Sequence, residues 1–215
     1  MSLPVIILCG GGHARVLIEA LKTSTMTILG ITDADPAKRN MLITGIPVLG
    51  DDDVVAHHRP GTIQLVNGMG SVSVPRVRTA LFERFKSQGY AFITVVHPSA
   101  VIASDVAIGE GAQIMAGAVI QPGSTIGLNT IVNTKASVDH DCHIGSHVHI
   151  SPGVTLSGDV RIGDGVHIGT GATVIQGISI GRNSLIGAGS VVVTDVPENA
   201  EFAGVPARQR VMKNS

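Results

Sequence analysis

Aromatic residues, blocks of like charge and long apolar runs are all scarce in this sequence. Aromatic side chains make up 2% of the 215 residues and tryptophan is absent, which disfavours a surface that stacks nucleic-acid bases. The 15 basic and 16 acidic residues are dispersed and give a net charge of −1, so we expect no nucleic-acid partner. No apolar run reaches the length of a membrane span. Residues 1–8 lack the basic start and cleavage site of a signal peptide, so we expect no membrane partner either.

Cysteine is also rare, with only Cys9 and Cys142 in the chain. The two lie in different halves of the sequence, so a disulfide framework is not expected. Unpaired cysteines are typical of reducing compartments. The composition therefore predicts a cytoplasmic protein.

An aliphatic residue recurs at every sixth position from Val96 to Val192, without a gap. The residue that follows it is often glycine, as at Gly109 and Gly127, and the fourth residue after it is small or β-branched. A period of six matches neither a helix nor an isolated strand. It is typical of a parallel β-helix, in which three repeats close a coil of about 18 residues. We expect each aliphatic residue to point inward, and each glycine to allow a positive φ at a corner.

The first 95 residues read as an α/β domain with a mainly parallel, Rossmann-like sheet. A buried strand at residues 4–8 leads through three consecutive glycines to a helical pattern at residues 14–21, and a second strand at residues 27–32 ends at Asp33. The pattern also predicts strands at residues 45–50, 63–66 and 91–95, a helical turn at 51–57 and a helix at 74–88. We therefore divide the chain into a first domain at residues 1–95 and a second at residues 96–215.

The glycine turn of the first domain is a candidate phosphate site. Free N–H groups at the start of the following helix attract anions. The three glycines match the dinucleotide fingerprint only loosely, and a tight strand-to-helix turn is the alternative interpretation. Asp33 ends the next strand, where such folds place an acceptor for a ribose or a base. Asn67 and Gly68 end a third strand, so we expect them to face the same crevice.

Histidines and acids cluster in the repeat between Asp139 and His149, and three interpretations compete. The first is a metal site, because His149 and His167 are one coil apart and would stack at about 4.8 Å. No third histidine faces this pair, whereas zinc usually takes three protein ligands. The second is a chance group of surface histidines at corners. The third is general base catalysis.

His140 and Gly158 carry the third interpretation. Asp141 follows His140, and a neighbouring carboxylate can orient an imidazole and stabilise its protonated form. Gly158 lies one coil further on and offers an N–H group with space above it, as a developing oxyanion requires. Cys142 occupies an inward position, so it reads as a core residue and not as an acyl carrier.

Four motifs resemble the left-handed β-helix nucleotide-sugar N-acetyltransferases of bacterial surface-glycan pathways, such as those of lipopolysaccharide O-antigen. They are Cys9-Gly10-Gly11-Gly12-His13-Ala14-Arg15-Val16, Asp33, Asp139-His140-Asp141-Cys142-His143-Ile144-Gly145 and Phe202-Ala203-Gly204-Val205-Pro206-Ala207. The resemblance covers essentially the whole chain. It implies a left-handed coil, acetyl-CoA as co-substrate, no metal, and a homotrimer with active sites between neighbouring subunits.

The resemblance also implies residue roles. His140 would be the general base that takes a proton from the C4 amine of a nucleotide-linked 4-amino-4,6-dideoxysugar, Asp141 its acidic partner, and Gly158 the N–H donor to the thioester oxygen. The residues expected to contact acetyl-CoA are His149, Gly158, Gly187, Ala188, Gly204, Pro206 and Arg208. Those expected to contact the nucleotide sugar are Gly10, Gly11, Gly12, His13, Arg15, Asp33, Asn67 and Gly68.

The substrate stays open in two respects. UDP-using relatives commonly have a second acid after the aspartate at position 33, and this chain has Ala34. The difference favours GDP-perosamine over a UDP-linked aminosugar. Two other functions remain possible: O-acetylation of a sugar hydroxyl, as in the related sialic-acid branch, and nucleotide-sugar binding without catalysis.

Overall fold

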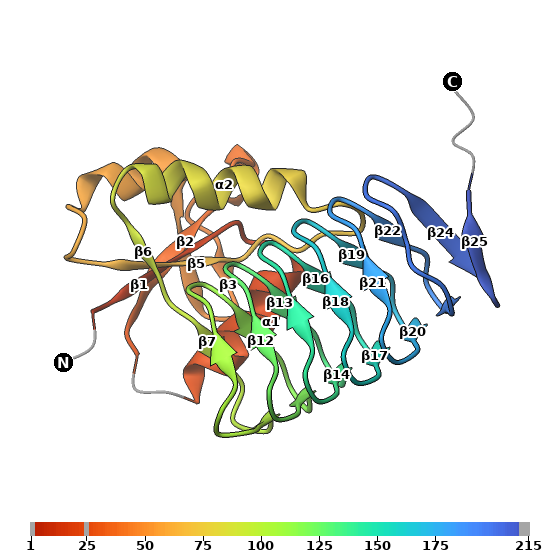
Figure 1. Ribbon diagram of the computed structural model, residues 1–215. Coiled ribbons are helices and arrows are strands. Elements are labelled where there is room, and N and C mark those ends of the chain that lie inside the picture. Colours follow the sequence, from red (N-terminus) through yellow and green to blue (C-terminus); the bar gives the residue numbers. More distant parts are fainter. Residues whose placement is uncertain (1–2, 24–25, 211–215) are drawn as a thin grey trace. The chain divides into compact units, whose positions relative to one another are not determined.

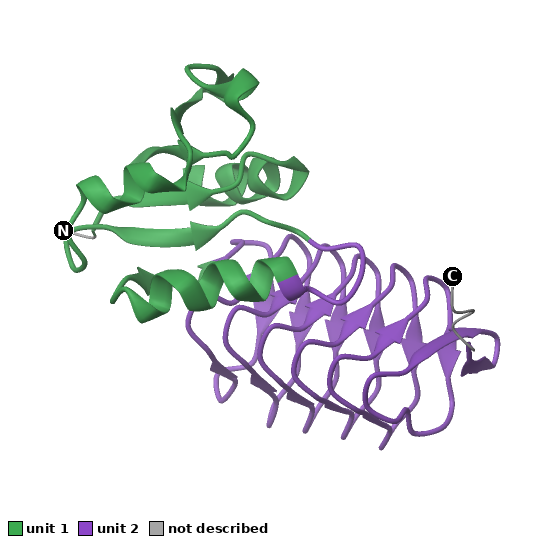
Figure 2. Ribbon diagram, turned by 90° about the horizontal axis from the view of Figure 1, so that it is seen from above, with its two compact units in different colours: residues 1–70, 77–95 green, residues 71–76, 96–215 purple. Residues whose placement is uncertain are grey.

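The computed structural model describes residues 3–23 and 26–210 and divides into two compact units (Figure 2). The first unit contains residues 1–70 and 77–95, and the second contains residues 71–76 and 96–215. The short segment 71–76 thus groups with the second unit although it lies within the first part of the sequence.

The first unit is built on one six-stranded sheet (Figure 1). The strand order is β3-β4-β2-β1-β5-β6, and all neighbouring pairs are parallel except β3 with β4. The strands are β1 (Val5–Leu8), β2 (Ile28–Thr32), β3 (Leu42–Ile43), β4 (Ile46–Gly50), β5 (Gln64–Asn67) and β6 (Ala91–Phe92). The helices are α1 (Gly12–Lys22) and α2 (Arg76–Ser87), with 3₁₀ turns η1 (Pro36–Lys38) and η2 (Asp52–His57).

Strand β1 lies at the centre of this sheet because it is apolar on both faces. All four of its residues are buried, as expected of a strand in a covered parallel sheet. Helix α1 follows β1 and buries one stripe, Ala14, Leu17, Ile18 and Leu21. The chain continues to β2 on one side of β1, and β5 pairs on the other side. The strand order therefore reverses at β1. Open α/β sheets bind ligands at the carboxyl ends of the strands at such a point.

The second unit is a β-helix of two-residue strands arranged in three faces (Figure 1). The first face consists of β7 (Val95–Val96), β10 (Gln113–Ile114), β13 (Ile131–Val132), β16 (His149–Ile150), β19 (His167–Ile168), β22 (Leu185–Ile186), β24 (Glu201–Gly204) and β25 (Ala207–Gln209). The second consists of β8 (Val101–Ile102), β11 (Val119–Ile120), β14 (Ser137–Val138), β17 (Thr155–Leu156), β20 (Thr173–Val174) and β23 (Val191–Val192). The third consists of β9 (Ala107–Ile108), β12 (Thr125–Ile126), β15 (His143–Ile144), β18 (Arg161–Ile162) and β21 (Ser179–Ile180).

Successive coils pair in register, one lap apart. Ile131 pairs with His149 and His149 with His167 on the first face, and the other faces repeat this spacing. The predicted strand at residues 91–95 is corrected by this arrangement. It is two strands, because β6 joins the sheet of the first unit and β7 starts the first face of the β-helix.

The inward aliphatic column forms the core of the β-helix. From Ile114 to Val192 the predicted inward positions are buried, and Cys142 is fully buried beside them. The start of the repeat differs from expectation: Val96 is 43% exposed, because the first coil has a neighbouring coil on one side only. The antiparallel hairpin of β24 and β25 follows the last coil, and its Phe202 is buried within the same core.

The glycine that follows each inward residue has a different role from the one expected. Positive φ occurs two residues later in the repeat, at glycines such as Gly111 and also at Asp141, where φ is 59°. At Gly163 a Cβ atom would lie 2.6 Å from the backbone nitrogen of Arg182. These glycines are required because adjacent coils approach closely at the corner, so the expectation of positive φ was wrong.

Candidate active site

His140 and Asp141 lie in the turn that joins β14 on the second face to β15 on the third. The His140 Nδ1 atom lies 2.9 Å from the Asp141 Oδ2 atom, so the proton of a neutral imidazole sits on Nδ1 and Nε2 keeps its lone pair. The turn is held by the His140 N–H, which donates to Asp139 Oδ1 at 2.8 Å, and by the Asp141 N–H, which donates to the carbonyl of Pro122 at 3.0 Å.

The His140 imidazole covers Gly158 on the next coil. A Cβ atom on residue 158 would lie 2.5 Å from both Nε2 and Cε1 of His140. Among the described residues the Gly158 N–H has no hydrogen-bond acceptor. The unprotonated ring nitrogen of His140 therefore lies against a residue whose backbone N–H is unused among the described residues, and the coil spacing predicts this neighbourhood.

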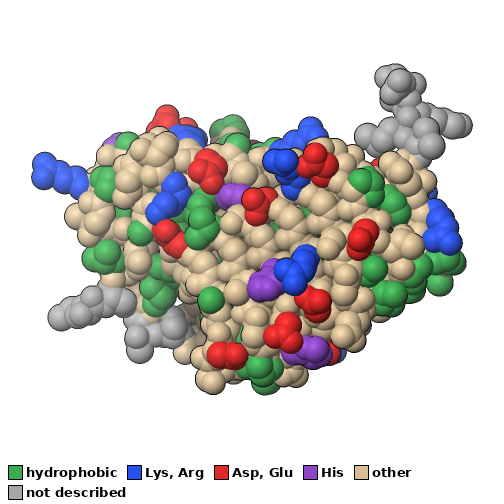
Figure 3. All heavy atoms as spheres, viewed as in Figure 1, with side chains coloured by type: hydrophobic (Ala, Val, Ile, Leu, Met, Phe, Trp, Pro, Cys, Tyr) green, Lys and Arg blue, Asp and Glu red, His purple; other side chains and the backbone are tan. Residues whose placement is uncertain are grey.

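Acidic neighbours raise the pKa of His140 above its ordinary value. The hydrogen bond that His140 Nδ1–H donates to Asp141 has the largest effect, and the charges of Asp139 and Asp159 act in the same direction. The side chains are accessible, with His140 52% and Asp141 67% exposed. On the face of the molecule shown in Figure 3, acidic and basic side chains are otherwise interspersed.

A second polar cluster lies on the first face of the β-helix, around His149 and His167. The two imidazoles are each 5% exposed and meet edge to face, with centroids 5.0 Å apart. They line a pocket of about 410 Å³ together with Asn133, Ser151, Gly187, Ala188 and others. Burial lowers the pKa of His167 to about 4, so this ring is neutral at physiological pH. The sequence predicted His149, Gly187 and Ala188 as residues of one site and the stacking of His167 on His149, but it did not indicate Asn133 or Ser151.

One chain does not bring His140 and His149 together. His140 lies at the corner between the second and third faces, and His149 lies on the first face. In a triangular coil that corner is opposite the first face. The predicted base and the predicted second histidine of the acyl pocket therefore point to opposite sides of the same β-helix.

The glycine turn of the first unit is open above α1. A Cβ atom on Gly10 would lie 2.5 Å from Ile43 Cδ1, so packing requires glycine there. At Gly11 and Gly12 a Cβ atom would meet nothing within 4 Å, and φ is not positive. Helix α1 has no side-chain cap and no acid in its first turn. The helix N-terminus is thus free to receive a negatively charged ligand, with His13 and Arg15 in its first turn.

Asp33 lies against this turn and already accepts several hydrogen bonds. Its Oδ2 atom receives the Gly10 N–H at 2.9 Å and the Lys38 ammonium at 2.7 Å, and Oδ1 receives the Asp35 N–H at 3.0 Å. Burial alone would raise the pKa of Asp33, but these donors, led by Lys38, lower it below its ordinary value. Lys38 was not predicted from the sequence; the 3₁₀ turn η1, capped by Asp35, carries it back to Asp33.

Asn67 and Gly68 have structural roles in the first unit. The Asn67 side chain is buried, donates to the Arg78 carbonyl at 3.0 Å and accepts the Met69 N–H at 3.2 Å. A Cβ atom on Gly68 would lie 2.6 Å from the carbonyl oxygens of Leu8 and Cys9. The Asn67 side chain therefore holds its own loop, and the expectation that Asn67 and Gly68 face the ligand crevice stays a prediction.

The remaining predicted cofactor contacts lie in the β24–β25 hairpin. Gly204 has a φ of 105° and donates its N–H to Ser190 Oγ at 3.1 Å. Arg208 is exposed and pairs with Ala203 across the hairpin. Pro206 follows a cis peptide bond in the turn. These three residues do not line the pocket that contains His149.

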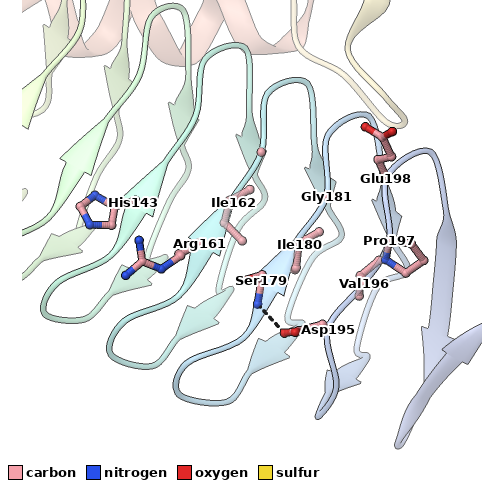
Figure 4. Close-up of a pocket in the computed structure, with 11 residues that line it drawn as sticks. His143, Arg161, Ile162, Ser179, Ile180, Gly181, Asp195, Val196, Pro197 and Glu198 are labelled. Carbon is pink, nitrogen blue, oxygen red and sulfur yellow. Dashed lines mark hydrogen bonds between the residues drawn. The ribbon is translucent and has the colours of Figure 1, made fainter.

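A wide groove of about 690 Å³ lies on the third face (Figure 4). Ile162 and Ile180 lie between charged residues that include Arg161, Asp195 and Glu198, and the Ser179 N–H donates to Asp195 Oδ1 at 2.8 Å. None of the residues predicted for the active site lines this groove.

The described residues contain neither a metal-binding group of side chains nor a membrane-spanning helix. In residues 3–23 and 26–210 no three or more histidine, cysteine, aspartate or glutamate side chains are grouped so that they could hold a metal ion. No helix in this part of the chain has both the length and the apolar character needed to cross a membrane.

Family models match both parts of the sequence. The PglD N-terminal domain matches residues 4–85, and the bacterial transferase hexapeptide family (six repeats) matches residues 159–194. A comparison with curated proteins gave no match.

Solved structures match the chain over its whole length. It is 39% identical to a variant of perosamine N-acetyltransferase from Caulobacter crescentus, bound to CoA and GDP-perosamine, with a TM-score of 0.90; 98% of this chain and 100% of that chain are covered. The chain belongs to the left-handed β-helix nucleotide-sugar N-acetyltransferase family. Another member is the acetyltransferase domain of PglB from Neisseria gonorrhoeae in complex with acetyl coenzyme A, 34% identical, with 98% and 100% covered and a TM-score of 0.88.

A third structure supports the fold of this family. WeeI from Acinetobacter baumannii is 24% identical, with 97% of this chain and 100% of that chain covered and a TM-score of 0.84. The second unit is accordingly a left-handed β-helix, and the protein is an acyltransferase of this family.

Proposed function

We propose that the protein transfers an acetyl group from acetyl-CoA to the C4 amine of a nucleotide-linked 4-amino-4,6-dideoxysugar, with GDP-perosamine as the favoured substrate. The observation that carries the proposal is the position of the His140 imidazole against Gly158, where only a residue without a side chain fits. Two features of the relatives support it: the Caulobacter crescentus enzyme holds CoA and GDP-perosamine, and the Neisseria gonorrhoeae domain holds acetyl-CoA.

The reaction is a direct attack of the amine on the thioester carbonyl. The C–N bond forms while the carbonyl oxygen becomes negative, and the Gly158 N–H donates to that oxygen. His140 Nε2 takes a proton from the attacking nitrogen, and Asp141 stabilises the imidazolium through Nδ1–H. The C–S bond then breaks, and His140 returns the proton to the CoA thiolate. The products are the sugar amide and CoA, and the proposed steps require no metal.

The acyl donor would lie between copies of the chain in a homotrimer. His140 and the pocket of His149, Gly187 and Ala188 lie on opposite sides of one β-helix. A single acetyl-CoA can contact both only if the His140 corner of one copy faces the first face of another. We therefore propose that the active site is completed by the neighbouring subunit, with Gly204, Pro206 and Arg208 nearer the far end of CoA.

The nucleotide sugar would bind to the first unit. The open space above Gly11 and Gly12 and the free helix N-terminus suit a diphosphate. Asp33 already accepts from N–H and ammonium groups, and the N1–H and N2–H₂ groups of guanine are donors of the same kind. We accordingly assign residues 1–95 to the nucleotide sugar and residues 96–215 to acetyl-CoA, and we place the reaction in the cytoplasm as a step in surface-glycan synthesis.

Product analysis tests the proposal. The protein would be incubated with acetyl-CoA and, in turn, GDP-perosamine, a UDP-linked 4-amino-4,6-dideoxysugar and a sialic acid, and CoA thiol release would be followed with a thiol reagent. We expect release to be fastest with GDP-perosamine, to be unaffected by a chelator, and to yield an acid-stable amide. A base-labile ester would assign the protein to O-acetylation, and the absence of release with every acceptor would indicate binding without catalysis.

The His140→Ala variant tests the base. Removing a general base typically costs about 10²–10⁴-fold in rate, and CoA affinity should be unchanged because the imidazole acts on the amine. Replacing a single histidine in the Caulobacter crescentus enzyme by asparagine or alanine left variants that hold both CoA and GDP-perosamine. His143→Ala is the matched control, since it removes an exposed imidazole three residues away. Equal turnover in the two variants would refute the base assignment.

A further inference from the structure

The buried pair of His149 and His167 is bridged by the hydroxyl of Ser71. The Ser71 Oγ atom lies 2.7 Å from His149 Nδ1 and 3.4 Å from His167 Nδ1. Ser71 belongs to the short segment 71–76 that groups with the β-helix. His167 Nε2 lies 3.5 Å from Ser151 Oγ on its other side. Four side chains thus form one connected row along the wall of the pocket on the first face.

The backbone sets the direction of the hydrogen bonds in this row. The Thr134 N–H donates to Asn133 Oδ1 at 2.8 Å, so the other end of the Asn133 side chain, Nδ2, faces His149 Nε2 at 3.1 Å. An amide nitrogen can only donate. His149 Nε2 therefore accepts, and the proton of the His149 ring lies on Nδ1.

The position of the proton on His149 also determines which nitrogen of His167 carries a proton. Because His149 Nδ1 carries the proton, it donates to Ser71 Oγ, which leaves the Ser71 hydroxyl proton to be donated elsewhere. His167 Nδ1 is placed to accept it, and the His167 proton then lies on Nε2, toward Ser151. Burial lowers the pKa of His167 to about 4, so the ring stays neutral and can accept at the pH of the cell.

We propose that His167 is a positioning residue of the acyl-donor pocket: by accepting the Ser71 hydroxyl proton it keeps Ser71 Oγ as the acceptor for His149 Nδ1–H, and so holds the His149 ring in a fixed orientation beside Asn133. The proposal rests on the proposed function, which places acetyl-CoA in this pocket. With His149 fixed as an acceptor, one N–H of Asn133 is directed to His149, so the amide presents its second N–H in a defined direction. If the hydrogen bonds of this row were weakened, the His149 ring and the Asn133 amide would be displaced relative to the thioester.

Paired substitutions at residue 167 test the role in catalysis. His167→Phe keeps a flat ring against His149 but removes the acceptor for Ser71, whereas His167→Asn keeps an acceptor near the Nδ1 position. We expect His167→Phe to lower kcat/KM for acetyl-CoA by about tenfold, the effect of one lost hydrogen bond to a positioned group. His167→Asn should recover most of the loss. Wild-type kinetics in a folded His167→Phe protein would overturn the proposal.

A double-mutant cycle with Ser71→Ala separates positioning from a general packing defect. If His167 acts through Ser71, the Ser71→Ala, His167→Phe double variant should be no slower than Ser71→Ala alone. Independent, additive losses would overturn the proposal.

A substrate-free measurement makes the test independent of the proposed function. In protein with ¹⁵N-labelled histidine, we expect the His149 nitrogen shifts to report protonated Nδ1 in the wild type and in both variants, because Asn133 still donates to Nε2. The His149 Nδ1–H proton should exchange with solvent faster in Ser71→Ala, which removes its acceptor, and in His167→Phe, which leaves the Ser71 hydroxyl without its own acceptor. An unchanged exchange rate in both variants would overturn the positioning role. A wild type that releases no CoA with any acceptor would instead refute the proposed function, and the exchange result would still stand.

Discussion

The imidazole of His140 lies over the backbone of Gly158, so close that a Cβ atom on residue 158 would be 2.5 Å from Nε2. The two residues are one lap apart in the β-helix, and the Asp159 N–H donates to the His140 carbonyl at 2.9 Å, which ties the two turns together. The coil itself therefore holds the proposed base and the proposed backbone donor at a fixed separation.

Gly158→Ala should inactivate the enzyme without unfolding it. The new methyl group would displace the half-exposed His140 ring, which can rotate into solvent, and would cover the Gly158 N–H. We expect kcat to fall by about 10²-fold, the effect of losing an oxyanion donor, with a nearly unchanged melting temperature. Steady-state kinetics and thermal unfolding measure the two effects. A variant with normal kcat would show that residue 158 is not beside the reacting atoms.

Asp141→Asn should shift the pH profile toward lower pH. Asp141 raises the pKa of His140, and a general base works only when unprotonated, so kcat/KM should rise with pH through the pKa of the free enzyme. Removing the carboxylate lowers that pKa, and the acid limb of the profile should move to lower pH while the maximal rate falls. Profiles of kcat/KM against pH for both proteins provide the measurement. An acid limb at the same pH in both would mean that His140 is not the titrating group.

Gly12→Val should block the nucleotide sugar and spare the fold. Outside the backbone of its own helix, no described residue lies within 4 Å of a Cβ atom at this position. Stability should therefore be preserved, whereas a bound diphosphate would meet the side chain. We expect KM for the nucleotide sugar to rise about tenfold or more, equivalent to about 1.4 kcal/mol, with KM for acetyl-CoA unchanged.

Gly68→Ala is the contrasting control for this prediction. Its Cβ atom would lie 2.6 Å from two carbonyl oxygens, so the melting temperature should fall. Equal effects of the two substitutions on stability would contradict the assignment of open space to Gly12.

His167 should make the protein less stable in mild acid. Its folded-state pKa of about 4 lies below the ordinary 6.5, so between these values the unfolded chain binds more protons and stability rises with pH. As pH falls from 6.5 toward 4, the wild type should lose up to about 3 kcal/mol from this group. His167→Phe lacks the titrating group and should lose correspondingly less. Thermal unfolding at pH 7.5 and pH 5, at one protein concentration, compares them; parallel declines would contradict the prediction.

The period of six was sufficient to predict the core of the β-helix. It placed Cys142 inside, and it placed His140 beside Gly158, because residues one lap apart must stack when the register is uniform. The same spacing indicated that His149 and His167 stack. The corner glycines were wrongly predicted to adopt a positive φ. Periodicity shows where a small residue recurs, but it does not show whether a positive φ or the close approach of the next coil requires glycine there.

Long-range partners could not be read from the sequence. Ser71 contacts His149 although 78 positions separate them. No sequence pattern indicates that the segment after β5 lies against a coil of the β-helix. Lys38 meets Asp33 only because a 3₁₀ turn reverses the chain. The Asn67 side chain bonds to the Arg78 carbonyl, and the Arg78 side chain bonds to the Asn67 carbonyl, a pairing that the sequence pattern did not indicate.

The sequence by itself determined the coil, its core and the position of His140 next to Gly158, because each of these depends on spacing along the chain. Only the tertiary structure decided which donors hold Asp33, which hydroxyl bridges the two histidines, and that His140 and His149 point to opposite sides of one β-helix. Those relationships depend on how separate segments pack against one another, and hydrophobic burial fixes that packing without leaving a local trace in the sequence.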